Sequence, residues 1–597
     1  MPQPDPSGLI TPDSAPLASR RTLFVSGAAF LIAIGAGLLA EALSALIGLI
    51  TSIAFHGRLA LGATPAGHHL GAWVILVPVI GALIVGVMAR YGSPAIRGHG
   101  IPEVMERILR HESRIAPGIT ILKPVSTAIS IGTGGPFGAE GPIIASGGAL
   151  GSLVGQMLRV TAEERKTLLA AGAAAGMAAT FGAPVSATLL AFELLLFEYR
   201  PGSLAPVALA TATATVVRYL FHGAAPVFAV PDIIASPGGE AMTAYVLLGA
   251  IVGFLSVSVT RGLYRVEDWF ETLPIHWMWW PALGAVVVGV LGWFEPRVLG
   301  VGYDNIVGLL NGTLIGRTAL VLVALKCLAW VVALGSGTAG GTMAPLFTIG
   351  GGAGSVLASL VIAAFPDIGV DVRIGALVGM AAMFTGASRA LLASVVFAFE
   401  ATRQPLGLLP LLAGCTGAYV ISLLRMRDTI MTERLVRRGV PVVTEYTVDH
   451  LSQVFARDRA TREVVTLPAD QSVLATREWL SEGGPGTSHQ GFPVVDGDGR
   501  LVGLLTRRDL LAPGDEGRLV RDLIHRPPVA VWETSSLREV ADLMVRHRVG
   551  RVPVISSDGR RTLRGILSRS DVLAAHEPRL EARKPAEPTI RLAFPLG

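Results

Sequence analysis

The sequence predicts an α-helical, polytopic membrane protein followed by a soluble α/β region. Of its 597 residues, 51% are hydrophobic and only 16% are charged, which is too apolar for an ordinary soluble protein of this length. Apolar runs dominate from Phe24 to about Leu424, and several exceed the roughly 20 residues that a spanning helix needs. After about Gly439, regular charges and alternating strand patterns replace these runs.

The domain boundaries follow from these changes in composition. We expect a loose N-terminal segment, a membrane domain, a linker, two soluble domains and a loose tail, at residues 1–19, 20–438, 439–450, 451–516, 517–577 and 578–597. Arginines flank the membrane domain on both sides, with Arg20 and Arg21 before the first apolar run and Arg425 and Arg427 just after the last. The positive-inside rule therefore places the N-terminus and the tail in the cytoplasm.

The membrane domain contains a repeat. The stretch KPVSTAISIGTGGPFGAEGPIIASGGALGS begins at Lys123, and KCLAWVVALGSGTAGGTMAPLFTIGGGAGS begins at Lys326. Counted from each lysine, Gly recurs at +9, +11, +15, +24, +25 and +28, Pro at +19 and Ser at +29. Each copy is followed by a Phe-Glu pair, ending at Glu193 and Glu400. The halves span about 24–225 and 240–432, and the repeat alone leaves open whether they run parallel or inverted.

Each repeat places a glycine-rich loop and a proline at the start of an apolar helix. These starts are GAEGP at 138–142 and GGTMAP at 340–345, and GHGIP at 98–102 is a third candidate. The unpaired N–H groups and the positive dipole end of such a helix favour an anion. Glu140 is the one charged residue of the stretch 132–152. Broken helices in duplicated halves indicate a transport site between them, here for a small dehydrated anion.

These motifs resemble the CLC family of chloride channels and chloride/proton exchangers, and the resemblance covers essentially the whole chain. GHGIP matches the family's GSGIP, GAEGP matches G(K/R)EGP, and GGTMAP matches GxFxP. The resemblance implies inverted-topology halves with broken helices, a bacterial inner (plasma) membrane location, a homodimer with one anion pathway per subunit, and Glu140 as the gating glutamate. The anion-binding residues that it implies are His99, Gly100, Ile101, Ala139, Gly141, Thr342, Met343 and Met431.

The chain departs from the family pattern at the anion site. His99 stands where the family often has Ser, and a neutral or protonated imidazole is still able to donate to an anion. Ala139 replaces a Lys or Arg before the gate. Met343 stands at the position of the family's Phe, and we expect the backbone N–H groups of Met343 and Thr342 still to serve the anion. Met431 falls at the family's central Tyr, so one hydroxyl donor to the anion is lost.

The proton pathway departs further. Exchangers of the family often carry adjacent Glu-Glu, and here the pair is Glu193-Leu194, which favours channel-like conduction. The alternative is a chloride/proton antiporter that uses Glu140, Glu193, water or Glu198, since Glu198 lies four residues beyond Leu194 and would share its helix face. A salt bridge with Arg200 is the simpler interpretation of Glu198.

Two further pairs recur in the repeats. Glu193 and Glu400, at the same place in each half, are interpreted as structural. Lys123 and Lys326 either attract anions electrostatically or pair with acids within the bundle.

The soluble region contains a second repeat. GFPVVDGDGRLVGLLTRRDLL at 491–511 matches GRVPVISSDGRRTLRGILSRSDVL at 550–573, each giving strand, turn, strand and a Thr/Ser-x-x-Asp helix start. This resembles a tandem pair of CBS domains. The resemblance implies an adenine nucleotide (ATP, ADP or AMP) held by Thr506, Asp509, Ser568 and Asp571. The alternatives are that these residues only cap helices and that the module serves dimerisation alone.

Other classes are disfavoured. The sequence has no GxxxxGK[ST] loop and no evident catalytic or metal-binding cluster, so we expect neither an enzyme nor a metal site, and no required cofactor or nucleic-acid partner. A fluoride exporter is disfavoured because that compact branch usually lacks a CBS tail. The rival from another class is a CBS-regulated cation transporter, which would need acidic or carbonyl-rich rings along its path. The expected partners are chloride or another halide, protons if the protein exchanges them, and lipid.

Overall fold

The structure, a computed structural model, describes residues 20–62, 68–231, 237–440, 450–452, 454–514, 517–558 and 560–577. These residues form two compact units, one within 20–440 and the other within 450–577. The expected loose ends at 1–19 and 578–597, and most of the expected linker, lie outside the described residues.

The first unit consists of helices joined by short loops. The helices of its first half are α1 (Arg20–His56), α2 (Leu76–Tyr91), α3 (Ile101–Arg110), α4 (Ile119–Gly132), α5 (Glu140–Met157), α6 (Ala162–Phe181), α7 (Pro184–Leu190) and α8 (Pro201–His222). Those of its second half are α9 (Gly239–Glu271), α10 (Trp280–Phe294), α11 (Tyr303–Leu310), α12 (Gly316–Gly335), α13 (Met343–Ala364), α14 (Val372–Ser388), α15 (Leu391–Thr402), α16 (Leu408–Arg425) and α17 (Glu433–Arg437). A π-helical segment, η3 (Ala191–Leu196), extends α7.

Short 3₁₀ turns connect several of these helices. They are η1 (Gly71–Ile75), η2 (Pro94–Ile96), η4 (Trp277–Trp279), η5 (Pro296–Val298), η6 (Pro366–Ile368) and η7 (Pro405–Gly407). Among the described residues, eight helices are long and apolar enough to cross a membrane, and many of their large apolar side chains are exposed. These features are those of a multi-pass membrane protein.

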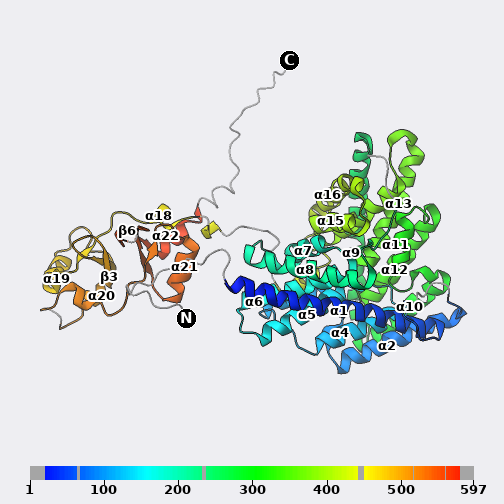
Figure 1. Ribbon diagram of the computed structural model, residues 1–597, viewed down its shortest axis with the longest axis horizontal. Helices are drawn as coiled ribbons and strands as arrows, with labels where there is room; N and C mark the ends of the chain where they lie inside the picture. The colour runs from blue at the N-terminus through cyan, green and yellow to red at the C-terminus, as the bar shows by residue number, and fades with distance from the viewer. Residues whose placement is uncertain are drawn as a thin grey trace, which may run out of the picture. The chain divides into compact units, whose positions relative to one another are not determined.

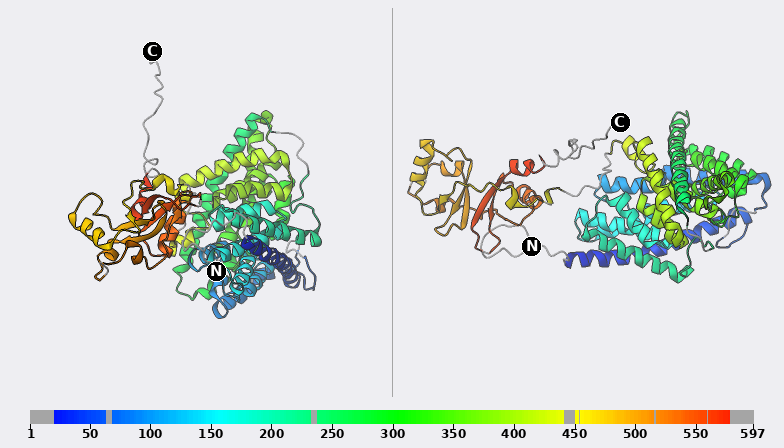
Figure 2. Two further views of the ribbon diagram at one scale, coloured as in Figure 1. Left: turned by 60° about the vertical axis from the view of Figure 1, so that its left-hand side comes forward. Right: turned by 90° about the horizontal axis from the view of Figure 1, so that it is seen from above.

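The two halves of this unit are packed in the same way and contact each other. The blue-to-cyan helices α1, α4, α5 and α6 lie together, and the green helices α11, α12 and α13 lie together, while α10 of the second half packs against α2 of the first (Figures 1 and 2). In the first half α5 crosses α6 where a Cβ at Gly172 would lie 2.2 Å from the Gly147 carbonyl oxygen. In the second half α13 crosses α14 where a Cβ at Gly379 would lie 2.3 Å from the Gly350 carbonyl oxygen. Small residues at matching positions therefore allow backbone-to-backbone contact in both repeats.

The second unit contains two similar α/β motifs. Its helices and strands are η8 (His450–Ser452), α18 (Ala456–Arg459), β1 (Leu467–Pro468), α19 (Val473–Glu482), β2 (Gly491–Val495), β3 (Leu501–Thr506), α20 (Arg507–Leu510), η9 (Val520–Leu523), β4 (Val531–Trp532), α21 (Leu537–Arg546), β5 (Arg551–Ile555), β6 (Leu563–Ser568) and α22 (Arg569–Ala574). The sheets have the orders β1-β2-β3 and β4-β5-β6, each with one parallel and one antiparallel pair. A bridge between Arg500 and Thr562 connects them.

Candidate anion pathway

The two repeat motifs of the membrane unit meet at Gly138 and Gly341. These residues hold the same place in the repeat and exchange both backbone hydrogen bonds, at 3.3 and 2.8 Å. Helix α5 begins two residues after Gly138, and α13 begins two residues after Gly341. A further backbone bridge, between Gly98 and Ala339, brings the loop before α3 to the same place. The structure thus gathers the three helix starts that the sequence singled out.

The Glu140 carboxylate lies at this junction. Glu140 is fully buried, and its Oε1 accepts a 2.8 Å hydrogen bond from the Tyr303 hydroxyl. Its Oε2 lies so close to two glycines that a Cβ at Gly138 or Gly341 would be 1.7 or 3.0 Å from it. No described residue donates a hydrogen bond of standard geometry to Oε2, although the backbone amides of Glu140 and Ala344 face the carboxylate.

Burying an ionised carboxylate costs several kcal/mol, so this position requires compensation. The hydroxyl group and the amino-terminal ends of α5 and α13 supply it, because charge-assisted hydrogen bonds and helix dipoles both favour the anionic form. The glycines are required here because any side chain at Gly138 would occupy the place of the carboxylate.

Tyr303 contacts Glu140 at this junction and was not among the predicted site residues. It is the first residue of α11 and follows the loop GVGYDN at 300–305, which is the counterpart of GHGIPE at 98–103 before α3. In both loops the two glycines have positive φ, at 86° and 95° for Gly98 and Gly100, and at 66° and 79° for Gly300 and Gly302. The second loop could have been found by allowing a gap in the repeat alignment, since Gly98 precedes its lysine by 25 residues and Gly300 precedes its lysine by 26.

The two repeat lysines hold these loops in place by hydrogen bonds. This role differs from both roles expected for them, attraction of anions and pairing with acids. The Lys123 ammonium donates to the carbonyl oxygens of Ile96 (2.7 Å) and Gly98 (3.0 Å). The Lys326 ammonium donates to those of Val298 (2.9 Å) and Gly300 (2.8 Å). Both lysines are fully buried, so the carbonyl groups replace the water that each charge has lost.

All eight residues expected to bind an anion are buried in the membrane unit: His99, Gly100, Ile101, Ala139, Gly141, Thr342, Met343 and Met431. The backbone oxygen of His99 lies against α5, since a Cβ at Gly141 would be 2.0 Å from it. Within the described part of the chain, His99 Nδ1 and Thr342 Oγ1 have no hydrogen-bond partner, so both retain hydrogen-bonding capacity.

The backbone N–H groups of two of these eight residues are engaged within the chain. The Gly100 N–H donates at 2.7 Å to the Glu103 carboxylate, which caps the start of α3. The Met431 N–H donates to Thr429 Oγ1 at 3.2 Å. Anion binding by Gly100 and Met431 stays a prediction.

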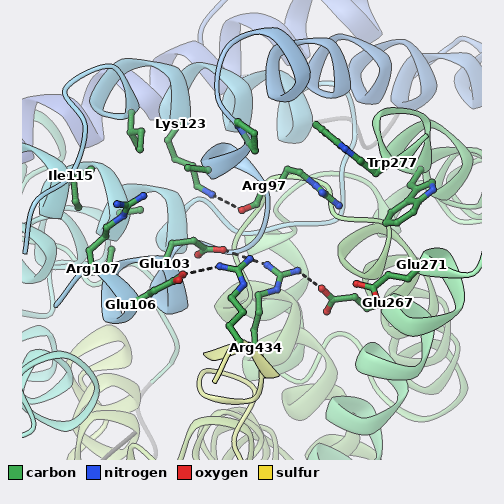
Figure 3. A pocket seen from close by; sticks show the side chains of 17 residues that line it. Arg97, Glu103, Glu106, Arg107, Ile115, Lys123, Glu267, Glu271, Trp277 and Arg434 are labelled. Atoms are coloured by element: carbon green, nitrogen blue, oxygen red, sulfur yellow. Dashed lines mark hydrogen bonds and ion pairs between the residues drawn. The ribbon is translucent and has the colours of Figure 1, made fainter. Parts of the chain in front are cut away.

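A cavity of about 620 Å³ lies beside the start of α3 (Figure 3). Arg434 lies in the wall of this cavity and forms ion pairs with two carboxylates of the same wall, Glu103 at 3.4 Å and Glu267 at 2.6 Å. The Arg97 guanidinium stands 4.7 Å from the ring centre of Trp277. The wall also includes Lys123, Ala145, Glu106, Arg107, Glu271, Trp280 and Arg438. A lining with both charge signs and this volume suits an aqueous vestibule.

Glu193 and Glu400 each cap the start of a helix in the opposite half of the membrane unit. Glu193 accepts 3.1 Å hydrogen bonds from the N–H groups of Leu392 and Ala393, the second and third residues of α15. Glu400 accepts from those of Val185 and Ser186, the second and third residues of α7, at 3.1 and 2.8 Å. This geometry supports their structural interpretation.

Glu198 does not share a helix face with Leu194. The π-helical segment ends at Leu196, and Phe197 turns the chain with φ of 55°, so the four-residue spacing no longer applies. Glu198 instead pairs with Arg200 at 3.1 Å and with Lys166 at 3.4 Å. Leu194 itself is 4% exposed, so the usual position of the inner proton acid is apolar and buried.

In the second unit, the Thr/Ser-x-x-Asp motifs form capping boxes. Thr506 Oγ1 accepts from the Asp509 N–H at 3.3 Å, while the Thr506 N–H donates to the Asp509 carboxylate at 2.8 Å. Ser568 and Asp571 repeat the arrangement at 3.4 and 2.7 Å. Both pairs are helix caps, and nucleotide binding by the same residues stays a prediction.

Comparison with known proteins agrees with this geometry. The family described as "Voltage gated chloride channel" matches residues 81–423, and "CBS domain" matches 456–513 and 520–577. The chain belongs to the CLC chloride channel family. Because the matching family is described as one of chloride channels, the cation-transporter alternative is disfavoured.

Relatives of this CLC protein include named exchangers. It is 28% identical over 351 residues to the H⁺/Cl⁻ exchange transporter ClcA of Citrobacter koseri, covering 57% of this chain and 73% of that one. It is 31% identical over 365 residues to the chloride channel protein CLC-e of Arabidopsis thaliana, covering 57% and 51%. The solved structure of a slow cyanobacterial Cl⁻/H⁺ antiporter superposes with a TM-score of 0.62 at 24% identity, covering 71% and 99%. The expected fold class, a CLC membrane domain with tandem CBS domains, is confirmed.

Proposed function

We propose that this protein transports chloride across the membrane through the junction of α3, α5 and α13, with Glu140 as the gate. The observation that carries the proposal is the buried Glu140 carboxylate, placed where two helix amino termini meet. A carboxylate in that position mimics the permeant anion, so chloride passes only after it displaces the carboxylate or after the carboxylate is protonated. His99 Nδ1 and the first amides of α5 and α13 then serve the anion.

Channel-like conduction is the mode that the residues around Leu194 support. Glu193 is engaged with the first turn of α15, and Glu198 is engaged with two cations. Leu194, which lies between these two acids in the sequence, is apolar. Among the described residues of this region, no acidic side chain is therefore free to carry a proton from the cytoplasmic side to Glu140.

Chloride/proton exchange is the second candidate, and the vestibule favours it. Its carboxylates Glu103 and Glu267 share Arg434, and its wall reaches Lys123 and Ala145 next to the start of α3. Water in a cavity of about 620 Å³ is able to deliver protons without an acid at Leu194. The relative ClcA is named an H⁺/Cl⁻ exchange transporter.

The test is the reversal potential of the purified full-length protein in a lipid bilayer under combined chloride and pH gradients. A reversal potential at the chloride equilibrium potential that ignores the pH gradient means a channel. Displacement by the pH gradient means exchange. A current carried by cations would overturn the proposal of anion transport.

We also propose a homodimer in a bacterial inner membrane, with a cytoplasmic CBS module that binds an adenine nucleotide. Calorimetric titration of the full-length protein with ATP, ADP and AMP tests the nucleotide. Binding that is lost in the Asp509→Ala/Asp571→Ala double variant supports it. A module that binds none of the three while the protein stays dimeric would leave dimerisation as its role.

A further inference from the structure

We propose that Tyr303 is a positioning residue for the gate, whose hydroxyl group holds the ionised Glu140 carboxylate in the anion pathway. The inference rests on the proposed gating role of Glu140. Its basis is the 2.8 Å hydrogen bond from the Tyr303 hydroxyl to Glu140 Oε1. Tyr303 lies in the second repeat and Glu140 in the first, so this contact joins the two halves at the candidate site.

The Tyr303 ring is held firmly, so its hydroxyl group is directed before any anion arrives. The ring makes edge-to-face contacts with Phe181 and Phe228, with ring centres 6.2 and 5.9 Å apart. The loop before it is held by Lys326 at the Gly300 carbonyl. A donor that is fixed in this way loses little side-chain entropy on binding the carboxylate.

Few other charged groups face this pair. Lys326 on α12 is the charged side chain near Glu140, and its ammonium is engaged with the loop carbonyls. Arg218 on α8 also acts electrostatically on the phenol, and it donates to the Thr180 carbonyl at 3.4 Å. The neighbouring residues at the starts of α5 and α13 are Ala139, Gly141, Pro142, Thr342, Met343 and Ala344, none of which titrates. Among the described residues, no ion pair involves Glu140.

The hydrogen bond therefore stabilises the closed state selectively. A phenol donates more strongly to an ionised carboxylate than to a protonated one, and hydrogen bonds to charged groups contribute about tenfold or more to an equilibrium. Without the hydroxyl group, chloride displaces the carboxylate more easily and a proton neutralises it at higher pH.

The experiment measures chloride efflux from liposomes as a function of pH for wild type, Tyr303→Phe, Glu140→Gln and the double variant. Tyr303→Phe keeps the ring and its contacts with Phe181 and Phe228. We expect its efflux at neutral pH to rise about tenfold and its half-activation to move about one pH unit upward. In the Glu140→Gln background the same substitution should change neither quantity. Tyr245→Phe is the matched control, because this buried tyrosine hydroxyl bonds the Asp371 backbone instead.

Two outcomes separate this inference from the proposed function. If Glu140→Gln alters efflux and Tyr303→Phe does not, Tyr303 has no positioning role and the gate stands. If Glu140→Gln behaves as wild type, the gate itself fails. An equal effect of Tyr303→Phe with and without Glu140→Gln would mean that the hydroxyl group acts on the anion directly, which overturns the inference. Incorporation of 3-fluorotyrosine, a stronger donor, should move half-activation toward lower pH.

Discussion

Glu193 and Glu400 are related by the internal repeat, and each carboxylate binds the first turn of a helix in the other half. Glu193 accepts from the second and third amides of α15, and Glu400 accepts from the second and third amides of α7. The four hydrogen bonds hold the starts of two short helices in opposite halves. They give both acids a structural role that needs no proton transfer.

Replacing either acid should therefore cost stability rather than proton coupling. We expect Glu193→Ala and Glu400→Ala each to lower the free energy of unfolding by about 1–2 kcal/mol, because each leaves two amides without their cap. Thermal unfolding in detergent measures this, with the exposed Glu240→Ala as control. Loss of proton movement in a stable Glu193→Ala protein would instead assign Glu193 to a proton path.

Gly141→Ala should disrupt the site where α3 meets α5. The new Cβ would lie 2.0 Å from the His99 carbonyl oxygen and 3.3 Å from the Gly341 Cα, so the two motifs must separate. Overpacking of this kind costs about 1–3 kcal/mol, and we expect chloride efflux to fall at least about tenfold. Gly262→Ala on α9 is the control, since a Cβ there has nothing within 4 Å. Efflux at the wild-type rate in Gly141→Ala would contradict this packing.

Lys326→Met and Lys123→Met should both destabilise the membrane unit, because each leaves two buried carbonyl groups without a donor. The expected cost is about 1–3 kcal/mol per unsatisfied group. Only Lys326 holds the loop that carries Tyr303, so only Lys326→Met should also move the pH dependence of efflux upward. An equal shift in both variants would contradict the distinction between the two lysines.

Glu198→Gln distinguishes the proton paths. Since Glu198 is engaged with Lys166 and Arg200 near the end of a helix, we expect no change in any proton movement and a stability loss below about 1 kcal/mol. Proton flux under a chloride gradient is the measurement. A clear decrease in that flux would make Glu198 the inner acid of an exchanger.

The sequence was sufficient to locate the helix starts and to bring them together as a site. Matching Gly and Pro offsets from Lys123 and Lys326 predicted the duplication, and Glu140 was identified as a charge among glycines. Glycine and proline report directly on local backbone geometry, which explains this success. The capping role of Thr506 and Ser568 followed from the same kind of local signal.

The contacts made by long side chains could not be predicted in this way. Lys123 and Lys326 reach carbonyl groups on loops more than twenty residues away, and Tyr303 reaches Glu140 across the two halves. The four-residue rule failed at Glu198 because the chain turns at Phe197, which has positive φ. The Glu103 carboxylate, three residues into α3, accepts a hydrogen bond from the Gly100 amide, a contact that was not predicted.

The central claim is that the Glu140 carboxylate closes the chloride pathway. The most direct measurement is chloride efflux from liposomes between acidic and neutral pH, comparing wild type with Glu140→Gln. The account predicts that wild-type efflux rises as pH falls, because protonation releases the carboxylate, and that Glu140→Gln conducts at all pH values without this dependence. A Glu140→Gln protein with the wild-type rate and the wild-type pH dependence would contradict it.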